Sequence, residues 1–198
     1  MKKFLSIIAI AFLTPSCFGQ PMMVTYSDGT KRTFDEFLES LHALDMEVEQ
    51  FSVDSFNYYF EQHLNRYRIA KNLSAVSYDK TVLKPAMDQA EYCSSKGFLD
   101  HRQYSDNKRW ASDRCDYYGV ERTIEFENLQ SCDMRISVME EYVKGVNYYD
   151  ALSRVVLWGW QLSPGHNASL LSQGEQFAVG ISRDDGYTMY SCFVLTSK

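Results

Sequence analysis

Apolar residues recur every three or four positions over much of the chain, which is the spacing of helices with one buried face. This pattern predicts an amphipathic helix over residues 34–48, a second helix over 55–71 and a third over 81–96. One or two further helices are expected over 135–161. The first helix, with acidic residues between its apolar positions, is interpreted as an appendage that packs onto the domain that follows.

Proline and glycine refine the ends of the third helix. Pro85 suits a helix best in its first turn, so this helix begins either near residue 81 or nearer Lys84. Gly97 suits the left-handed position that ends a helix.

The last part of the chain changes from helical to strand-like spacing. Residues 176–183 and 187–195 flank a turn at 184–186 and predict a β-hairpin. Residues 98–131 are polar and irregular, and we expect them to be loop-like. Helices followed by an antiparallel hairpin indicate an α+β or α/β/α layered fold rather than a wound βαβ sheet.

Residues 1–19 have the order of a secretory signal peptide. Two lysines precede the apolar run 4–13, which is too short to span a membrane, and small and turn residues follow. Cleavage after Gly19 would leave an N-terminal appendage at 20–51 and one domain at 52–198. We therefore expect a secreted or periplasmic protein without a transmembrane anchor.

The cysteines support export. Cleavage would remove Cys17 and leave an even number, which in an exported chain predicts two disulfides. These remaining cysteines are Cys93, Cys115, Cys132 and Cys192. An alternative keeps Cys17 as a lipid anchor, because residues 14–17 loosely resemble a lipobox.

Composition and charge exclude several classes of protein. The chain is 45% hydrophobic, as is usual for a globular domain, which excludes disordered, collagen-like and coiled-coil proteins. Its formal net charge is −6, so no nucleic-acid partner is expected.

Histidines and one glutamate are the candidate site residues, since the chain has no nucleophile elbow, phosphate-binding glycine loop, HExxH or CxxC motif. His42 and His63 lie within predicted helices and are interpreted as surface or packing residues. His101 and His166 lie beside turn residues, and Glu127 lies between apolar neighbours. If these three converge, they could bind a divalent cation, because imidazole and carboxylate are suitable ligands.

The order of short motifs along the chain resembles the CAP superfamily, which includes cysteine-rich secretory proteins, antigen 5 and pathogenesis-related proteins. The similarity is greatest to its bacterial SCP-like extracellular branch. The matching residues are Asn65 and Arg68, Tyr78-Asp79, Ala86 and Ala90, His101, Glu127-Asn128, the run from Trp160 through Ser163-Pro164 to His166, and Val179-Gly180.

Two features depart from the family pattern. Phe126 stands where the family has a glycine before the glutamate, so the backbone there must turn differently. The stretch that would supply a second glutamate is absent, so the resemblance supports a site of His101, Glu127 and His166.

The resemblance implies an α+β fold, an α/β/α three-layer sandwich with a small central antiparallel sheet and a cleft that holds both histidines. We expect a secreted binding or interaction module whose cleft is suited to zinc or another divalent cation, held by His101, His166 and Glu127. One alternative is a metal-dependent hydrolase, a peptidase, with Glu127 as catalytic base. Catalysis is the weaker interpretation, because Glu127 cannot be both the third ligand and the base. Another alternative is a lipid or sterol binder lined by aromatic residues.

The expected partner is an extracellular ligand, protein or lipid, and the expected oligomeric state is a monomer. The preferred disulfide pairing is Cys93–Cys115 with Cys132–Cys192, one of three possible connectivities.

Overall fold

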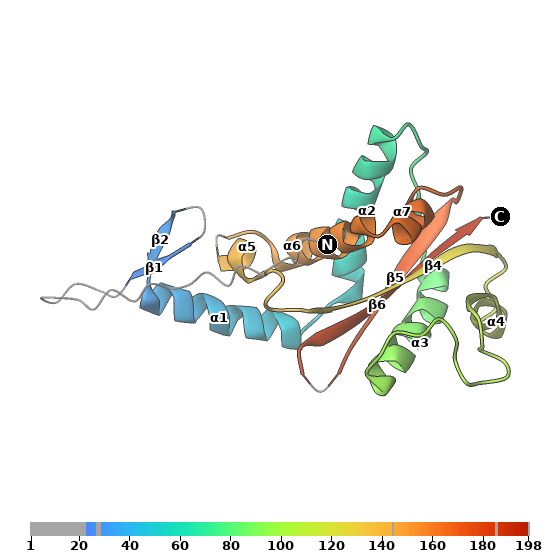
Figure 1. Ribbon diagram of the computed structural model, residues 1–198, viewed down its shortest axis with the longest axis horizontal. Coiled ribbons are helices and arrows are strands. Elements are labelled where there is room, and N and C mark those ends of the chain that lie inside the picture. Colours follow the sequence, from blue (N-terminus) through green and yellow to red (C-terminus); the bar gives the residue numbers. More distant parts are fainter. Residues whose placement is uncertain (1–22, 27–28, 144, 185, 198) are drawn as a thin grey trace, which may run out of the picture.

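The computed structural model describes residues 23–26, 29–143, 145–184 and 186–197 (Figure 1). The predicted signal peptide, with Cys17, lies outside these residues. The helices are α1 (Phe34–Glu49), α2 (Val53–Ala70), α3 (Lys80–Lys96), α4 (Ala111–Tyr117), α5 (Met139–Val143), α6 (Tyr148–Leu162) and α7 (Pro164–Leu170). The strands are β1 (Met23–Thr25), β2 (Lys31–Thr33), β3 (Ser77–Tyr78), β4 (Thr123–Asp133), β5 (Gln176–Arg183) and β6 (Thr188–Ser197). Within the described ranges, no helix combines the length and apolar character needed to cross a bilayer.

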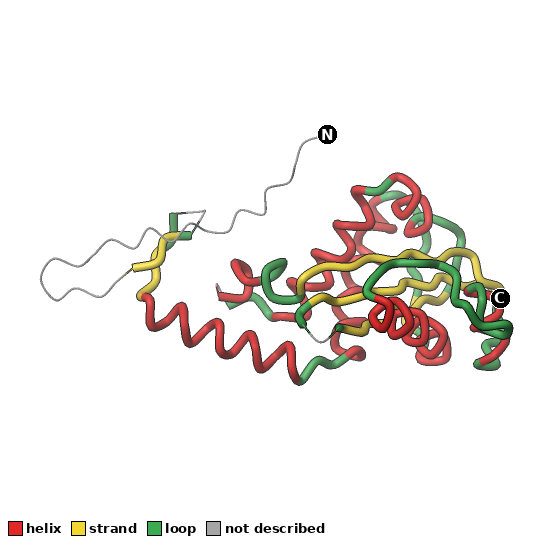
Figure 2. Tube along the Cα trace, turned by 60° about the horizontal axis from the view of Figure 1, so that its bottom comes forward, coloured by secondary structure: helices red, strands yellow, loops and turns green. Residues whose placement is uncertain are grey.

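A four-stranded sheet in the order β3-β5-β6-β4 forms the centre of the fold. β6 pairs antiparallel with both β5 and β4, while the two-residue strand β3 pairs parallel with β5. Helices α2, α6 and α7 cover one face of the sheet, and α3 and α4 cover the other (Figures 1 and 2). The predicted three-layer α+β sandwich is confirmed, and its sheet differs from the expectation only in this short parallel edge.

Aromatic side chains fill the layer between the sheet and α2, α6 and α7. Phe60 lies at the centre, with its ring centroid 5.7 Å from those of both Trp160 and Phe177. Phe193 completes the cluster, and all four side chains are buried. Alternate strand residues face this layer because successive side chains of a strand point to opposite faces.

Two polar residues of α2 are structural. The Asn65 side chain bonds both backbone groups of Val76, each at 2.8 Å. The buried Arg68 guanidinium donates to the carbonyl oxygens of Leu170 and Ser172. The residues that match the family pattern in this helix therefore fix neighbouring loops and do not line the cleft.

Small residues let α3 lie close to the opposite face of the sheet. Gly180 in β5 faces α3, and a Cβ atom at this position would lie 2.2 Å from the backbone carbonyl of Ala86. Ala86 and Ala90 are both buried in this layer. The Val-Gly pattern in the sequence thus reflects a close contact between a strand and a helix.

The predicted N-terminal helix is confirmed as α1. A capping box begins it, in which the Thr33 hydroxyl accepts the Glu36 amide and the Glu36 carboxylate accepts the Thr33 amide. Leu44 and Val48 are buried near its C-terminal end. Figure 2 shows α1 extending away from the sandwich, with the β1–β2 hairpin at its far end.

The third predicted helix begins at Lys80 rather than near Lys84. The Asp79 carboxylate accepts the Thr81 amide at 2.7 Å and caps the helix there. Pro85 therefore lies beyond the first turn, and Gly97 ends the helix with φ 73° as predicted.

The expectation that residues 98–131 are mostly loop is only partly correct. They include α4 and most of β4. An extra residue at Glu125 forms a bulge, so that Ile124 pairs with Thr196 and Phe126 with Leu195. The bulge interrupts the alternating pattern that identifies a strand in a sequence.

The four described cysteines are unpaired thiols. Leu129, not Cys132, lies opposite Cys192 in the sheet register, so Cys132 and Cys192 face opposite layers. The expected Cys132–Cys192 disulfide is incompatible with this register. Cys93 of α3 and Cys115 of α4 lie with Cys192 in the buried layer between these helices and the sheet.

We expect Gly180→Ala to destabilise the protein by about 3 kcal/mol or more, because the added methyl group would overlap helix backbone that cannot move independently. Gly165→Ala is the matched control, since a Cβ there meets nothing within 4 Å and the residue is helical. Urea unfolding of both variants provides the comparison. Equal stability of the two would contradict the close packing of α3 on β5.

Peptide mapping of the exported protein without reduction tests the cysteine arrangement. Any disulfide should join two of Cys93, Cys115 and Cys192, and Cys132 should be recovered as a free thiol. A Cys132–Cys192 peptide would show that the register of β4 and β6 is wrong.

Candidate functional site

Glu127 lies on β4, two residues after the bulge, and faces the layer of α3 and α4. Only 7% of its side chain is exposed. A carboxylate buried to this degree needs a charged or hydrogen-bonding partner. Glu127 is therefore a buried, paired carboxylate rather than an exposed strand residue.

Arg114 on α4 is the main partner of Glu127. Its guanidinium is fully buried, and Nη2 donates to Glu127 Oε2. Nη1 lies 3.3 Å from the carbonyl oxygen of Lys108 and 3.5 Å from that of His101. Arg114 thereby connects the strand, the short helix and the loop that carries the first candidate histidine.

His101 contacts the other oxygen of the same carboxylate. Its Nδ1 lies 2.9 Å from Glu127 Oε1, and about half of the imidazole is exposed. The hydrogen bond to Glu127 raises the pKa of His101 above its usual 6.5, although burial acts in the opposite direction. The ring is thus held by Nδ1, which leaves Nε2 to face a ligand.

The loop before α4 is fixed to α3 by a polar cluster. Lys108 Nζ lies 2.9 Å from Asp88 Oδ1, and Gln103 donates to Asp88 Oδ2 at 3.0 Å. Gln103 also donates to Gln89, whose amide donates to the Asp100 carbonyl next to His101. This network holds the loop, and with it the position of His101.

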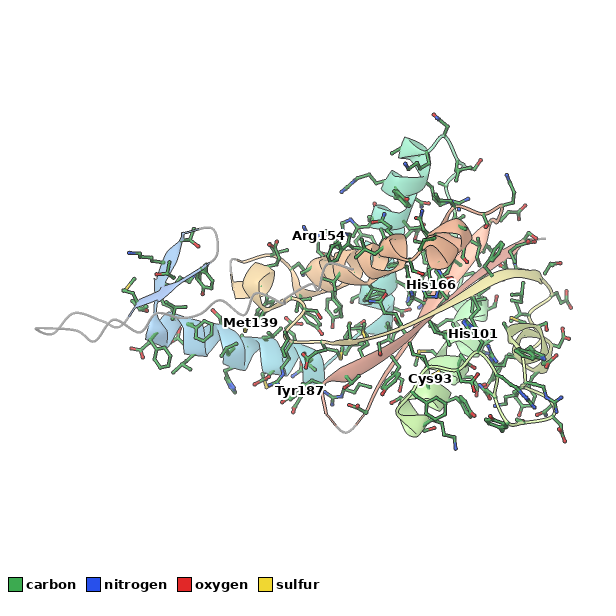
Figure 3. The ribbon with its side chains drawn as sticks, viewed as in Figure 1. Cys93, His101, Met139, Arg154, His166 and Tyr187 are labelled. Atoms are coloured by element: carbon green, nitrogen blue, oxygen red, sulfur yellow. The ribbon has the colours of Figure 1, made fainter. Side chains whose placement is uncertain are left out.

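His166 reaches the site from the opposite layer. It lies in the first turn of α7, and Asn128 donates to its carbonyl oxygen at 3.0 Å. Since Asn128 and Glu127 are neighbours on a strand, they face opposite sides of the sheet. Figure 3 shows both histidines near β4.

The two imidazoles differ in protonation. Burial lowers the pKa of His166 below 6.5, and the positive charge of His101 lowers it further. His166 is therefore a mostly neutral imidazole at pH 7, the form that binds metals.

The structure brings the predicted residues together only in part. His101 and Glu127 are in contact, whereas His166 interacts with His101 through its charge. Across the described residues, no group of three or more His, Cys, Asp or Glu side chains is arranged to hold a metal. The metal role of the three predicted residues stays a prediction.

An open cleft of about 380 Å³ lies above the His101–Glu127 pair. It is lined by His101, Trp110, Ala111, Ser112, Ile124, Glu125, Phe126 and Glu127. Sequence reasoning missed Trp110 and Arg114. The available signal for Trp110 was the acidic residue three positions later, since Asp113 accepts the Trp110 amide at 2.9 Å and begins α4 there.

The two remaining histidines are not among the residues that line the cleft. His42 is exposed on α1. His63 on α2 lies 2.6 Å from Asp150 on α6 and helps to hold these helices together.

Comparison with known proteins agrees with the fold. The sequence profile of the cysteine-rich secretory protein family, CAP, matches residues 62–195, and the chain belongs to this family. The resemblance inferred from the ordered motifs is thereby confirmed. No curated protein sequence matches the chain.

Solved structures of bacterial proteins are similar. An outer surface protein from Borrelia burgdorferi superposes with a TM-score of 0.55 at 11% identity, covering 75% of this chain and 96% of that one. An extracellular protein containing an SCP domain from Bacillus anthracis gives 0.49 at 17% identity, covering 73% and 41%. The CAP domain of enterococcal PrgA gives 0.48 at 19% identity, covering 87% and 82%. The first of these shows that the fold is shared.

NMR titration of the histidine rings tests the charge arrangement. We expect the pKa of His101 to lie above 6.5 and to fall in Glu127→Gln, because the hydrogen bond to the carboxylate raises it. We expect the pKa of His166 to lie below 6.5 and to rise in His101→Asn. Glu121→Gln on the surface is the control.

The raised pKa of His101 also makes the stability of the fold depend on pH. Because the folded-state pKa of His101 is raised, its stabilising contribution is complete below about pH 6.5 and is lost as the pH rises through the folded-state value. The stability difference between the wild type and His101→Asn should therefore shrink above neutral pH. A His101 pKa that is the same in the wild type and Glu127→Gln would contradict the contact.

Proposed function

We propose that this protein is an extracellular binding module of the CAP family, and that its ligand occupies the cleft above His101 and Glu127. The signal-like pattern of residues 1–19 supports export. A structure with the same fold is described as an outer surface protein, which is consistent with this location.

The engagement of both Glu127 oxygens favours binding over hydrolysis. Oε1 faces His101, and Oε2 accepts from Arg114 and lies 3.5 Å from Cys192 Sγ. A general base must be free to accept a proton from a water near the substrate. Glu127 instead has the contacts of a residue that positions His101.

Zinc or another divalent cation is a second candidate ligand. His101 Nε2 and the neutral imidazole of His166 are suitable nitrogen donors. Glu127 fits the role of a carboxylate that orients a metal-binding histidine through its other nitrogen. A bound ion would polarise an oxygen ligand, but two protein nitrogens predict weak affinity.

The paired tyrosines Tyr148-Tyr149 and Tyr58-Tyr59, which are the aromatic residues proposed to line a lipid site, give the lipid-binding alternative little support. Tyr148 is buried, and both Tyr148 and Tyr149 pack against Phe51 between α1 and α2. Tyr58 and Tyr59 contact each other on α2, with Tyr58 exposed. The first pair is ordinary core packing.

Chemical-shift mapping with a library of small molecules tests the binding proposal. Ligands should shift the backbone amides of residues 101, 110–112 and 124–127. Binding confined to the groove between α2 and α6, around His63 and Trp158, would contradict the proposed location. Turnover of peptide or ester substrates that is lost in Glu127→Gln would support the hydrolase alternative instead.

Calorimetric titration with zinc tests the metal candidate. We expect weak, saturable binding that falls at least tenfold in His101→Ala and in His166→Ala, and about tenfold in Glu127→Gln. His42→Ala, on the exposed face of α1, is the control and should bind as the wild type does. Identical binding by all these proteins would exclude a metal site at the two histidines.

A further inference from the structure

Two aromatic residues line the cleft and are exposed to solvent. Trp110, at the start of α4, is 51% exposed, and Phe126, next to the bulge in β4, is 40% exposed. Exposed aromatic rings that line one cleft are a surface for recognition rather than part of the core. Phe126 occupies the position where the CAP pattern has glycine, so this chain adds an aromatic ring there.

Above the pKa of His101, the polar groups of the cleft give it acidic character. Glu125 and Glu127 both line it, and none of the described lining residues is a lysine or an arginine. Arg114 neutralises Glu127 from below, but it is fully buried and engaged with the carboxylate and with loop carbonyls. Glu125 accepts the Ser197 hydroxyl through Oε1.

This combination selects the charge of the ligand. The face of an aromatic ring attracts cations, and the attraction is larger for indole than for other rings. Above the pKa of His101, whose half-exposed imidazole also lines the cleft, an anionic ligand would meet the Glu125 carboxylate with no guanidinium or ammonium group among the described lining residues to compensate. A nearby carboxylate beside aromatic faces is the chemistry that recognises organic ammonium groups.

We propose that the cleft binds an alkylammonium group, with Trp110 and Phe126 as its aromatic contacts and Glu125 as its counter-charge. This inference rests on the proposed function, since it names the ligand class of the same cleft. A primary amine, as in a lysine side chain, and a quaternary amine, as in choline, share the required chemistry.

The groove between α2 and α6 provides a comparison with the Trp110 cleft within the same protein. It also carries an exposed tryptophan, Trp158, and has a similar volume of about 400 Å³. Its charged lining residues are Arg66 and Arg154 rather than carboxylates. Aromatic exposure alone would predict cation binding at both places, whereas the charge argument predicts it only at the Trp110 cleft.

The test is a titration with choline and with N-acetyl-lysine methylamide, followed by amide chemical shifts at pH 8.5 to limit positive charge on His101. The neutral isostere of choline, 3,3-dimethylbutanol, is the matched control ligand. Choline or the lysine derivative should shift residues 101, 110–112 and 124–127, and the isostere should bind at least tenfold more weakly. Comparison of the two affinities shows whether the cleft prefers a primary or a quaternary ammonium group.

Variants separate the contributions of the side chains. Trp110→Ala and Phe126→Gly should each weaken ammonium binding about tenfold, and Glu125→Gln about threefold. Trp158→Ala should bind as the wild type does. Thermal unfolding of each variant checks that the fold is retained.

Three results would overturn the inference. Equal affinity for choline and its neutral isostere would show that the cleft recognises shape alone. Binding of N-acetylglucosamine or a carboxylate that depends on Trp110, without ammonium binding, would overturn the ligand class but leave the proposed function intact. Absence of any ligand-induced shift at the cleft residues would overturn both.

Discussion

The buried ion pair between Arg114 and Glu127 is the interaction on which the cleft depends. It joins α4 to the edge strand β4, and through the loop carbonyls it also holds the segment that carries His101. Removal of one partner from a buried pair leaves an uncompensated charge, so the two residues stabilise the cleft only together. His101 contacts the carboxylate that this connection holds in place.

The position of β4 at the sheet edge determines how this strand contacts the segments of both histidines. Glu127 and Asn128 are adjacent but face opposite layers, so one holds the loop of His101 and the other contacts the helix of His166. A central strand would have neighbouring strands on both sides, so segments of the two layers could not approach each other around it. The bulge at Glu125 adds a second effect, because it places Glu125 and Phe126 together opposite a single residue of β6.

The sequence predicted those parts of the fold that depend on local periodicity. Four of the helices, the closing hairpin and the helix end at Gly97 were found in this way, and family motifs located His101, Glu127 and His166. The start of β4 was missed because the bulge breaks its alternation. Arg114 was missed because its importance comes from a partner 13 residues away, across a turn that no periodicity describes. The predicted Cys132–Cys192 disulfide was wrong. Whether two residues on neighbouring strands face the same side of the sheet depends on the strand register, which only the folded sheet reveals.

A double-mutant cycle between Arg114 and Glu127 tests the central claim most directly. Urea unfolding would be measured for the wild type, Arg114→Met, Glu127→Gln and the double variant. Each single substitution should cost several kcal/mol, and the double variant should cost little more than the larger single one, which corresponds to a coupling of about 3 kcal/mol. Strictly additive losses would contradict the claim that this buried pair organises the cleft.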